Sequence, residues 1–161
     1  IFTTVDGMAV DTILIQREFS TEDDERRRAE RIADMVRKAL RGELWLKEAV
    51  ARAYRPQLRI NAFTVEPRVI IDNQSSNRFT VIEINGRDRV GLLYDLTEAL
   101  YKLNLNIGSA HVTTFGEKAI DVFYVTDLTG GKIENETRRM QIEKALAKVL
   151  ASPQSDAHGP V

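Results

Sequence analysis

The feature that most constrains this chain is an internal repeat with a spacing of 110 residues. The segment 3–15 recurs at 113–125 as a Thr-Thr pair, an Ala-Val/Ile-Asp triplet and three apolar residues, without a gap. Self-similarity at one fixed spacing predicts two units that are built alike. A predicted strand and helix over 79–103 precede the downstream copy, whereas nothing precedes the upstream copy before Ile1. We therefore expect a fragment that begins inside its first repeat.

The composition permits a globular core and excludes several functional classes. Hydrophobic residues make up 43% of the chain, charged residues 29%, and the formal net charge is −1. This balance offers no general attraction to nucleic acid or to an anionic membrane. No apolar run approaches the roughly 18 residues of a membrane span, and the N-terminal residues lack the features of a signal peptide. The chain has no cysteine, which excludes disulfides and thiolate chemistry, and we expect a cytoplasmic protein.

The N-terminal residues predict a hairpin followed by a long helix. Two short β-branched runs within 1–16 flank an Asp-Gly turn at 5–8. Ser20 or Thr21 can cap a helix whose first turn holds four acids, where the helix dipole favours negative charge. An apolar stripe then runs to the helix end at Gly42. The stripe consists of Ala29, Ile32, Ala33, Val36 and Leu40.

A second helix and a strand complete the upstream region. The helix is expected over 43–54, and the strand over 63–72. Pro67 interrupts this strand and restricts it to a sheet edge or a bulge. The polar run 72–77 is predicted to be a linker.

The downstream region predicts the order strand, helix, strand, strand, helix. A strand over 79–84 and a turn over 85–89 lead to Gly91, which starts a helix. The apolar face of that helix consists of Leu93, Leu96, Leu100 and Leu103. A hairpin follows over 107–126, and Gly130-Gly131 turns the chain into a last helix over 136–150. Its inward residues are Ile142, Leu146 and Val149.

These elements predict an α+β fold, a ferredoxin-like βαββαβ domain that lacks a convincing last strand. We expect the second half of a preceding repeat, with an inserted second helix, over 1–73. The complete repeat covers 77–151, and 152–161 is a flexible tail. Because unpaired strand edges recruit other strands, we predict that the hairpin at 1–16 pairs with the second repeat, in the same chain or in another copy.

The turn over 85–92 is the first candidate for a binding site. A strand, a glycine and a helix start in succession present free backbone N–H groups, which suit a carboxylate or a phosphate. Asp88 could hold the ammonium group of a ligand. The alternative is that Asn85-Gly86 forms a tight turn and that Asp88 only caps the helix.

Other polar residues give weaker signals. His111 and His158 are far apart and have no acidic partner at metal-ligand spacing, so we predict no metal site. Asp11 and Asp121 occupy equivalent positions in apolar strands, and we interpret them as structural carboxylates bonded to backbone groups. We predict no catalytic residue.

The strand over 119–126 is apolar on both faces. Ala119, Phe123 and Val125 point one way, and Ile120, Val122 and Tyr124 point the other. A strand of this kind is expected to be covered on both faces. Association between units is therefore predicted.

Four segments of the downstream unit resemble the ACT family. They are N-G-R-D-R-V-G-L-L at 85–93, Y-D-L-T-E-A-L at 94–100, N-I-x-S-A at 106–110 and D-V-F-Y-V-T-D at 121–127. The D-R-V element departs from the commoner D-R-P of that family. The tandem arrangement further resembles the C-terminal regulatory end of bacterial [protein-PII] uridylyltransferase/uridylyl-removing enzymes, through 2–16 and 67–73.

This resemblance implies a regulatory region that senses an amino acid, most simply glutamine, and that pairs with itself or with another ACT domain. The ligand-binding residues it implies are Asn85, Gly86, Asp88, Val90, Gly91 and Leu92, with Ile107, Gly108 and Ser109 as a neighbouring wall. The fragment itself would need no cofactor and would catalyse nothing. Upstream catalytic domains, which use a divalent metal such as Mg²⁺, would attach and remove uridylyl groups on the PII protein.

Two other functions remain open from the residues alone. The apolar strand faces also fit a ligand-free dimerisation or interaction module. A ferredoxin-like sheet can bind RNA through exposed aromatic residues in basic surroundings, but Phe123 and Tyr124 face opposite sides and the net charge is −1. We therefore expect no nucleic-acid partner.

Overall fold

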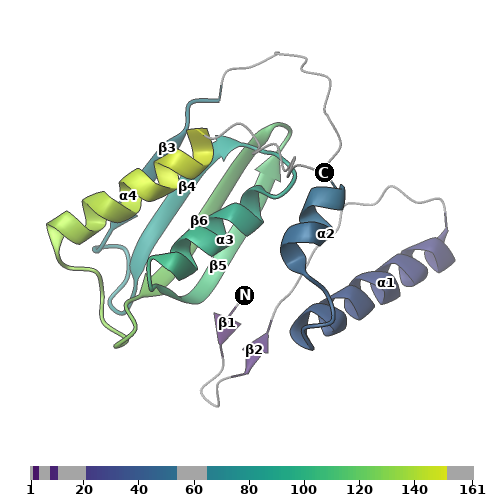
Figure 1. The fold of residues 1–161 in the computed structure, drawn as a ribbon. Coiled ribbons are helices and arrows are strands. Elements are labelled where there is room, and N and C mark those ends of the chain that lie inside the picture. Colours follow the sequence, from purple (N-terminus) through teal and green to yellow (C-terminus); the bar gives the residue numbers. More distant parts are fainter. Residues whose placement is uncertain (1, 4–7, 11–20, 54–64, 152–161) are drawn as a thin grey trace, which may run out of the picture. The chain divides into compact units, whose positions relative to one another are not determined.

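The computed structural model describes residues 2–3, 8–10, 21–53 and 65–151 (Figure 1). Contacts divide the chain into two units, one made of residues 1–11 and 56–161 and the other of residues 12–55. The first unit carries an antiparallel sheet with two helices, and the second carries two further helices. The predicted boundary between repeats at 73–77 stays a prediction.

The sheet of the first unit has the strand order β2-β1-β5-β6-β4-β3. All neighbouring pairs are antiparallel. The strands are β1 (Phe2–Thr3), β2 (Ala9–Val10), β3 (Arg68–Asp72), β4 (Thr80–Arg87), β5 (Asn106–Phe115) and β6 (Lys118–Thr126).

Strand β3 completes the fold from the N-terminal side. It begins directly after Pro67 and pairs with β4 at the outer edge of the sheet, so the predicted edge position is confirmed. In a βαββαβ fold the last strand lies in this place, beside the first. The sheet β5-β6-β4-β3 with helices on one side is therefore the predicted α+β ferredoxin-like fold, and its fourth strand comes from the chain before β4.

The segment 72–77 is a tight connection between β3 and β4, so the prediction of a linker is wrong. The Asp72 carboxylate accepts hydrogen bonds from two following backbone N–H groups at 2.7 and 3.0 Å. The Lys132 ammonium donates to the carbonyl oxygens of Asn73 and Ser76 at 2.6 and 2.7 Å. Asp, Asn and Ser occur in linkers and in bonded turns alike, and only these tertiary hydrogen bonds distinguish the two.

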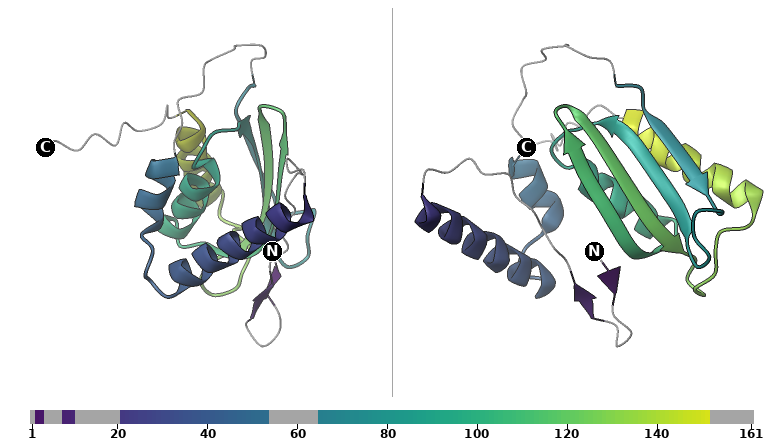
Figure 2. Two further views of the ribbon diagram at one scale, coloured as in Figure 1. Left: turned by 90° about the vertical axis from the view of Figure 1, so that its right-hand side faces the viewer. Right: turned by 180° about the vertical axis from the view of Figure 1, so that it is seen from behind.

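Helices α3 (Leu92–Lys102) and α4 (Glu136–Ala151) cover one face of this sheet (Figures 1 and 2). The core lies between them and the strands. It includes Ile82, Ile84, Leu92, Leu96, Leu100, Phe123, Val125, Ile142 and Leu146. Of the predicted inward residues of α4, Ile142 and Leu146 are buried and Val149 packs partly buried against the core.

The predicted apolar face of α3 is wrong by one position at its start. Leu92 is buried, whereas Leu93 is 42% exposed. Both residues lie at helical spacing from Leu96, so periodicity alone does not separate them. The rotation of the helix over the sheet decides which one enters the core.

The two faces of β6 confirm the predicted alternation. Ala119, Phe123 and Val125 are buried beneath the helices, while Ile120, Val122 and Tyr124 are half-buried on the opposite face. The hairpin between β5 and β6 turns at Gly116, whose φ of 60° is in the left-handed region that glycine adopts without strain.

The short hairpin β1–β2 joins the sheet at β5. Phe2 pairs with Val10 within the hairpin and with Ser109 of β5. The predicted pairing between this hairpin and the second repeat is thus confirmed, within one chain. At a spacing of 110 residues, β1 corresponds to part of β5 and β2 to part of β6. Equivalent strands of the two repeats therefore lie edge to edge and antiparallel, as a local two-fold relation requires.

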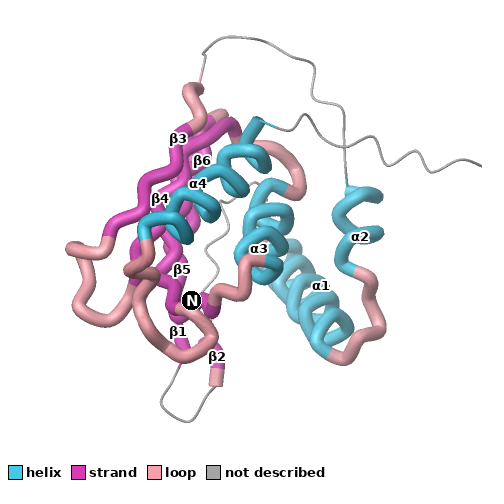
Figure 3. Tube along the Cα trace, turned by 60° about the vertical axis from the view of Figure 1, so that its left-hand side comes forward, coloured by secondary structure: helices cyan, strands magenta, loops and turns pink. Residues whose placement is uncertain are grey.

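The second unit contains α1 (Glu22–Leu40) and α2 (Leu46–Ala53) (Figure 3). Thr21 is the predicted N-cap of α1, and its hydroxyl accepts a hydrogen bond from the Asp24 N–H at 3.3 Å. Neither helix has a buried residue among those that the structure describes. By the repeat spacing, Ile32 and Val36 of α1 correspond to Ile142 and Leu146 of α4. None of the described helices is long and apolar enough to cross a membrane.

Candidate functional site

The candidate site lies where β4 passes into α3. Strand β4 continues to Arg87, and the next residue, Asp88, donates its backbone N–H to the Glu117 carbonyl at 2.8 Å. This bond ties the end of β4 to the β5–β6 turn. The chain then reverses over residues 88–91 and enters the helix.

The N-terminus of α3 has no side-chain cap. Gly91 is the N-cap residue, with φ 83° in the left-handed region, and the first intrahelical bond runs from the Asp95 N–H to the Gly91 carbonyl at 2.9 Å. A side chain at this position would strain the backbone, which explains the glycine. The alternative in which Asp88 caps the helix is therefore wrong. In an α-helix the N–H groups of the first turn, here including those of Leu93 and Tyr94, have no partner within the helix.

Arg89 fixes this loop to both helices. Its Nη2 lies 2.6 Å from Asp95 Oδ2 in α3 and 3.5 Å from the Val149 carbonyl oxygen in α4. A guanidinium beside the last carbonyl groups of a helix also suits the negative end of its dipole. No role for Arg89 was predicted from the sequence, although its place in the D-R-V-G element was a signal.

Asp121 is a buried carboxylate in β6, the strand that pairs with β4. The register places it on the helix-facing side of β6, opposite Ile84 of β4 and Val112 of β5, and only 2% of its surface is exposed. Burial and the neighbouring charge of Asp88 raise the pKa of Asp121 to about 6, against the opposing effect of a hydrogen bond from the Thr113 backbone. Among the described residues, Asp121 Oδ1 has no hydrogen-bond partner. The prediction that Asp121 is a structural carboxylate bonded to backbone groups therefore accounts for only part of its environment. Asp11, its equivalent in the first repeat, lies outside the described residues.

Asn85 and Gly86 lie in β4 rather than in a turn, so the predicted turn over 85–89 begins too early. Asn85 is on the face away from the helices, where its side-chain amide donates to Glu83 Oε1 at 2.7 Å. A Cβ on Gly86 would lie 2.6 Å from Leu150 Cδ2, so this glycine allows α4 to approach the sheet. Local turn composition concealed a strand whose pairing with β6 extends to Arg87.

The remaining loop positions divide between surface and core. Val90 is 37% exposed, whereas Leu92 is 3% exposed and its side chain belongs to the core. The Leu92 N–H donates to the Arg89 carbonyl at 3.1 Å and is therefore already bonded. Of the predicted backbone donors, those of the first turn of α3 fit a ligand better than Leu92.

The predicted wall at Ile107, Gly108 and Ser109 lies at the other end of the sheet. Ser109 is opposite Tyr124, four residues along β5 from the row that contains Asn85. At about 3.3 Å per residue this separation is about 13 Å. A Cβ on Gly108 would lie 2.5 Å from Phe79 Cε1, so Gly108 accommodates an aromatic ring. The structure thus places Asp88 and Gly91 on one loop and separates this loop from 107–109 of the same unit.

The histidines do not form a metal centre in the part of the chain that the structure describes. The exposed His111 ring lies edge-on to Tyr124, with ring centroids 5.9 Å apart, and His158 is outside the described residues. No cluster of three or more His, Cys, Asp or Glu side chains suitable for a metal occurs among the described residues.

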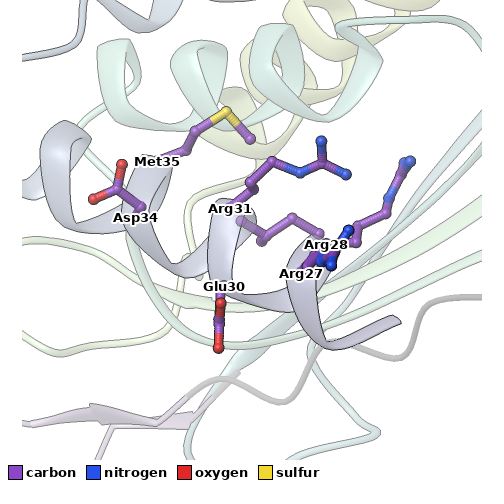
Figure 4. A pocket seen from close by; sticks show the side chains of 7 residues that line it. Arg27, Arg28, Glu30, Arg31, Asp34 and Met35 are labelled. Carbon is purple, nitrogen blue, oxygen red and sulfur yellow. The ribbon is translucent and has the colours of Figure 1, made fainter. Parts of the chain in front are cut away.

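A hollow on α1 is a weaker candidate. Figure 4 shows Arg27, Arg28, Glu30, Arg31, Asp34 and Met35 around it, and the lining residues that the structure describes come from this one helix. Asp34 is paired with Lys38 at 2.8 Å. A single helix face of exposed charged side chains does not enclose a ligand.

The sheet with two helices on one face has the α+β ferredoxin-like fold of an ACT domain. Residues 75–152 match the ACR family N-terminal ACT domain, so this segment of the chain is an ACT domain. No solved structure was found to match the chain.

The chain also resembles part of a larger class of enzymes. It is 53% identical over 152 residues to the bifunctional uridylyltransferase/uridylyl-removing enzyme of Nitrobacter hamburgensis, a match that covers 94% of this chain and 16% of that protein. It is 54% identical over 157 residues to the enzyme of the same name from Bradyrhizobium sp. (strain ORS 278), covering 98% of this chain and 17% of that protein. The chain therefore spans about a sixth of the length of these curated relatives.

Proposed function

We propose that this chain senses a free α-amino acid, glutamine, at the N-terminus of α3. The observation that carries the proposal is the combination of an uncapped helix N-terminus with a carboxylate on the same loop. An α-amino acid is a zwitterion, so it needs donors for its carboxylate and an acceptor for its ammonium group. The first-turn N–H groups would supply the donors, and Asp88 the acceptor.

The predicted wall at 107–109 is proposed to act across paired ACT units. Within one unit it is too far from Asp88 to contact the same small ligand. The edge-to-edge pairing of β1 with β5 supports an arrangement in which the β5 edge of one unit faces the loop of the other. In this arrangement the wall would line a second ligand site, with Ile107, Gly108 and Ser109 on one side. The loop of that second site would belong to the preceding repeat, 110 positions before the loop at 85–92.

The regulatory consequence follows from the relatives, which are named uridylyltransferase/uridylyl-removing enzymes. We propose that glutamine occupancy controls the attachment and removal of uridylyl groups on the PII protein by catalytic domains elsewhere in the protein. Those domains, and not this region, would hold a divalent metal such as Mg²⁺. A cytoplasmic location stays a prediction.

Titration calorimetry with a panel of amino acids tests the sensing function. We expect glutamine to bind and the Asp88→Asn variant to lose about 10-fold or more in affinity, because a charge-assisted hydrogen bond contributes about 1.5–3 kcal/mol. Glu143→Gln is the matched control, since it removes one negative charge from an exposed position of α4. Failure of every amino acid to bind a folded chain would refute the proposal.

A second candidate function is a ligand-free interaction module. The observation that favours it is the half-buried apolar surface on the sheet face away from the helices, formed by Ile70, Ile120, Val122 and Tyr124. Sedimentation of the wild-type chain and of Tyr124→Asp compares their association. A monomer at high concentration, unchanged by the substitution, would refute this second function.

A further inference from the structure

The sheet face away from α3 and α4 carries rows of side chains that the strand register defines (Figure 2). The central row crosses four strands, from β3 through β4 and β6 to β5. Its members are Ile70, Glu83, Val122 and His111, and each is the register partner of the next. Glu83 and the exposed His111 therefore lie on either side of Val122, each one strand away from it.

The residues of β6 on this face form an uncharged column over 120–124. Ile120, Val122 and Tyr124 follow one another at every second position, and all three are half-buried on the face opposite to α3 and α4. The carboxylate of the central row stands one strand to the side, at Glu83. Its Oε1 accepts a hydrogen bond from the Asn85 side-chain amide at 2.7 Å. The middle of the face is thus apolar, and its charge lies off the line of β6.

We propose that a second copy of this chain docks on this face, with a two-fold axis that runs along β6 through Val122. This inference rests on the second candidate function, the interaction module, and names its partner and its geometry. A two-fold axis brings each residue on it against its own copy and exchanges the residues on its two sides. The β6 column then meets itself through apolar side chains, and Glu83 of each copy meets His111 of the other.

The positions of Glu83 and His111 favour this axis over the other two-fold packing of the same faces. An axis across the strands through the same point would place each Glu83 against its own copy, and two facing carboxylates repel each other. With the axis along β6, each carboxylate faces an imidazole, which carries an N–H donor in either tautomer. Two such pairs form at once, one on each side of the column.

The usual geometry of packed sheets accommodates these contacts. Facing sheets lie about 10 Å apart and cross at about 30°, and neighbouring strands are about 4.8 Å apart. At one strand from the axis, this crossing displaces the two partners of a pair by only about 2.5 Å. Lys118 begins β6 on the same face, and there the crossing separates it from its own copy by about 7 Å. Repulsion between the two lysines is therefore weak.

Sedimentation of two charge variants, alone and mixed, tests the pairing. We expect Glu83→Lys and His111→Glu each to weaken self-association about 10-fold or more, because each removes both attractive pairs. In a mixed dimer one pair is native and the other joins the introduced lysine to the introduced glutamate. An equimolar mixture should therefore associate within about 3-fold of the wild-type affinity. Glu143→Lys is the matched control, since it makes the same charge change at an exposed position of α4, on the other side of the sheet.

The results separate this inference from the second candidate function. A wild-type chain that stays monomeric at high concentration overturns both. Self-association that neither charge variant weakens overturns the Glu83–His111 pairing and leaves the interaction module intact. Weakening without recovery in the mixture also overturns the pairing, because a disturbance within each chain would not be cured by mixing.

A measurement on the wild type keeps the inference testable if a variant fails to fold. Labelled and unlabelled chains are mixed, and isotope-filtered NMR detects contacts between copies only. We expect contacts from the Val122 methyl groups of one copy to Val122 and Tyr124 of the other. Their absence in a chain that associates overturns the proposed axis.

Discussion

Replacing Asp121 with asparagine should change the pH dependence of folding even without a ligand. Burial and the charge of Asp88 raise the pKa of Asp121 from 3.8 to about 6 in the folded protein. The folded protein therefore holds this proton between about pH 4 and pH 6, where the unfolded chain has already lost it. The free energy of unfolding must fall as the pH rises through this window, because the native state binds more protons than the unfolded state.

The size of the fall follows from the pKa. When folding raises the pKa of a carboxyl from 3.8 to about 6, the free energy of unfolding of the protein falls by about 3 kcal/mol between low and neutral pH. Asparagine has nearly the same shape and no charge, so Asp121→Asn should show no such fall. Asp88→Asn removes only the neighbouring charge and should reduce the fall partly.

Urea unfolding at intervals from pH 4 to pH 7.5 measures this difference. Amide NMR signals of β4 and β6 report on the sheet that contains Asp121, without contributions from α1 and α2. Hydrogen bonds from Ser75 and Thr129 lower the pKa values of Asp72 and Asp127, and the stability that these two contribute is lost below about pH 4, outside the window. Parallel pH curves for the wild type and Asp121→Asn would refute the reasoning.

Two further predictions concern the frame of the site. Gly91→Ala should lower the free energy of unfolding by about 1–2 kcal/mol, because alanine is strained at φ 83°; an unchanged urea midpoint would contradict this. Deleting residues 1–16 removes the strand that pairs with β5 at Ser109 and should lower the melting temperature by a few degrees while hydrogen exchange in β5 becomes faster. Equal melting and equal exchange in the truncated chain would show that the hairpin adds nothing to the sheet.

Local signals in the sequence predicted several element ends correctly. Thr21 caps α1 as expected, and Gly91, Gly116 and Gly130 lie at turns or helix starts with positive φ. These features depend on a few adjacent residues and on the conformational freedom of glycine, so the sequence contains the information they need. The alternating faces of β6 were also predictable, because they too depend only on the order of adjacent residues.

Errors arose where a choice depended on distant partners. Leu92 and Leu93 satisfy the same helical spacing, and the packing of α3 on the sheet selects Leu92. Asn85 and Gly86 have turn composition, but their pairing with β6 keeps them in β4. Asp88 is of a residue type that often caps helices, but it does not cap α3.

The sequence by itself determined the repeat, the order of strands and helices, and the loop that precedes α3. It also contained the carboxylate in β6, because Asp121 interrupts an apolar strand. Only the tertiary structure decided that β3 closes the sheet beside β4 and that 107–109 lie at the opposite end from the loop. It likewise decided that Asp121 is buried on the helix-facing side of β6, because strand register and helix docking set which side chains share an environment, and neither is encoded in local spacing.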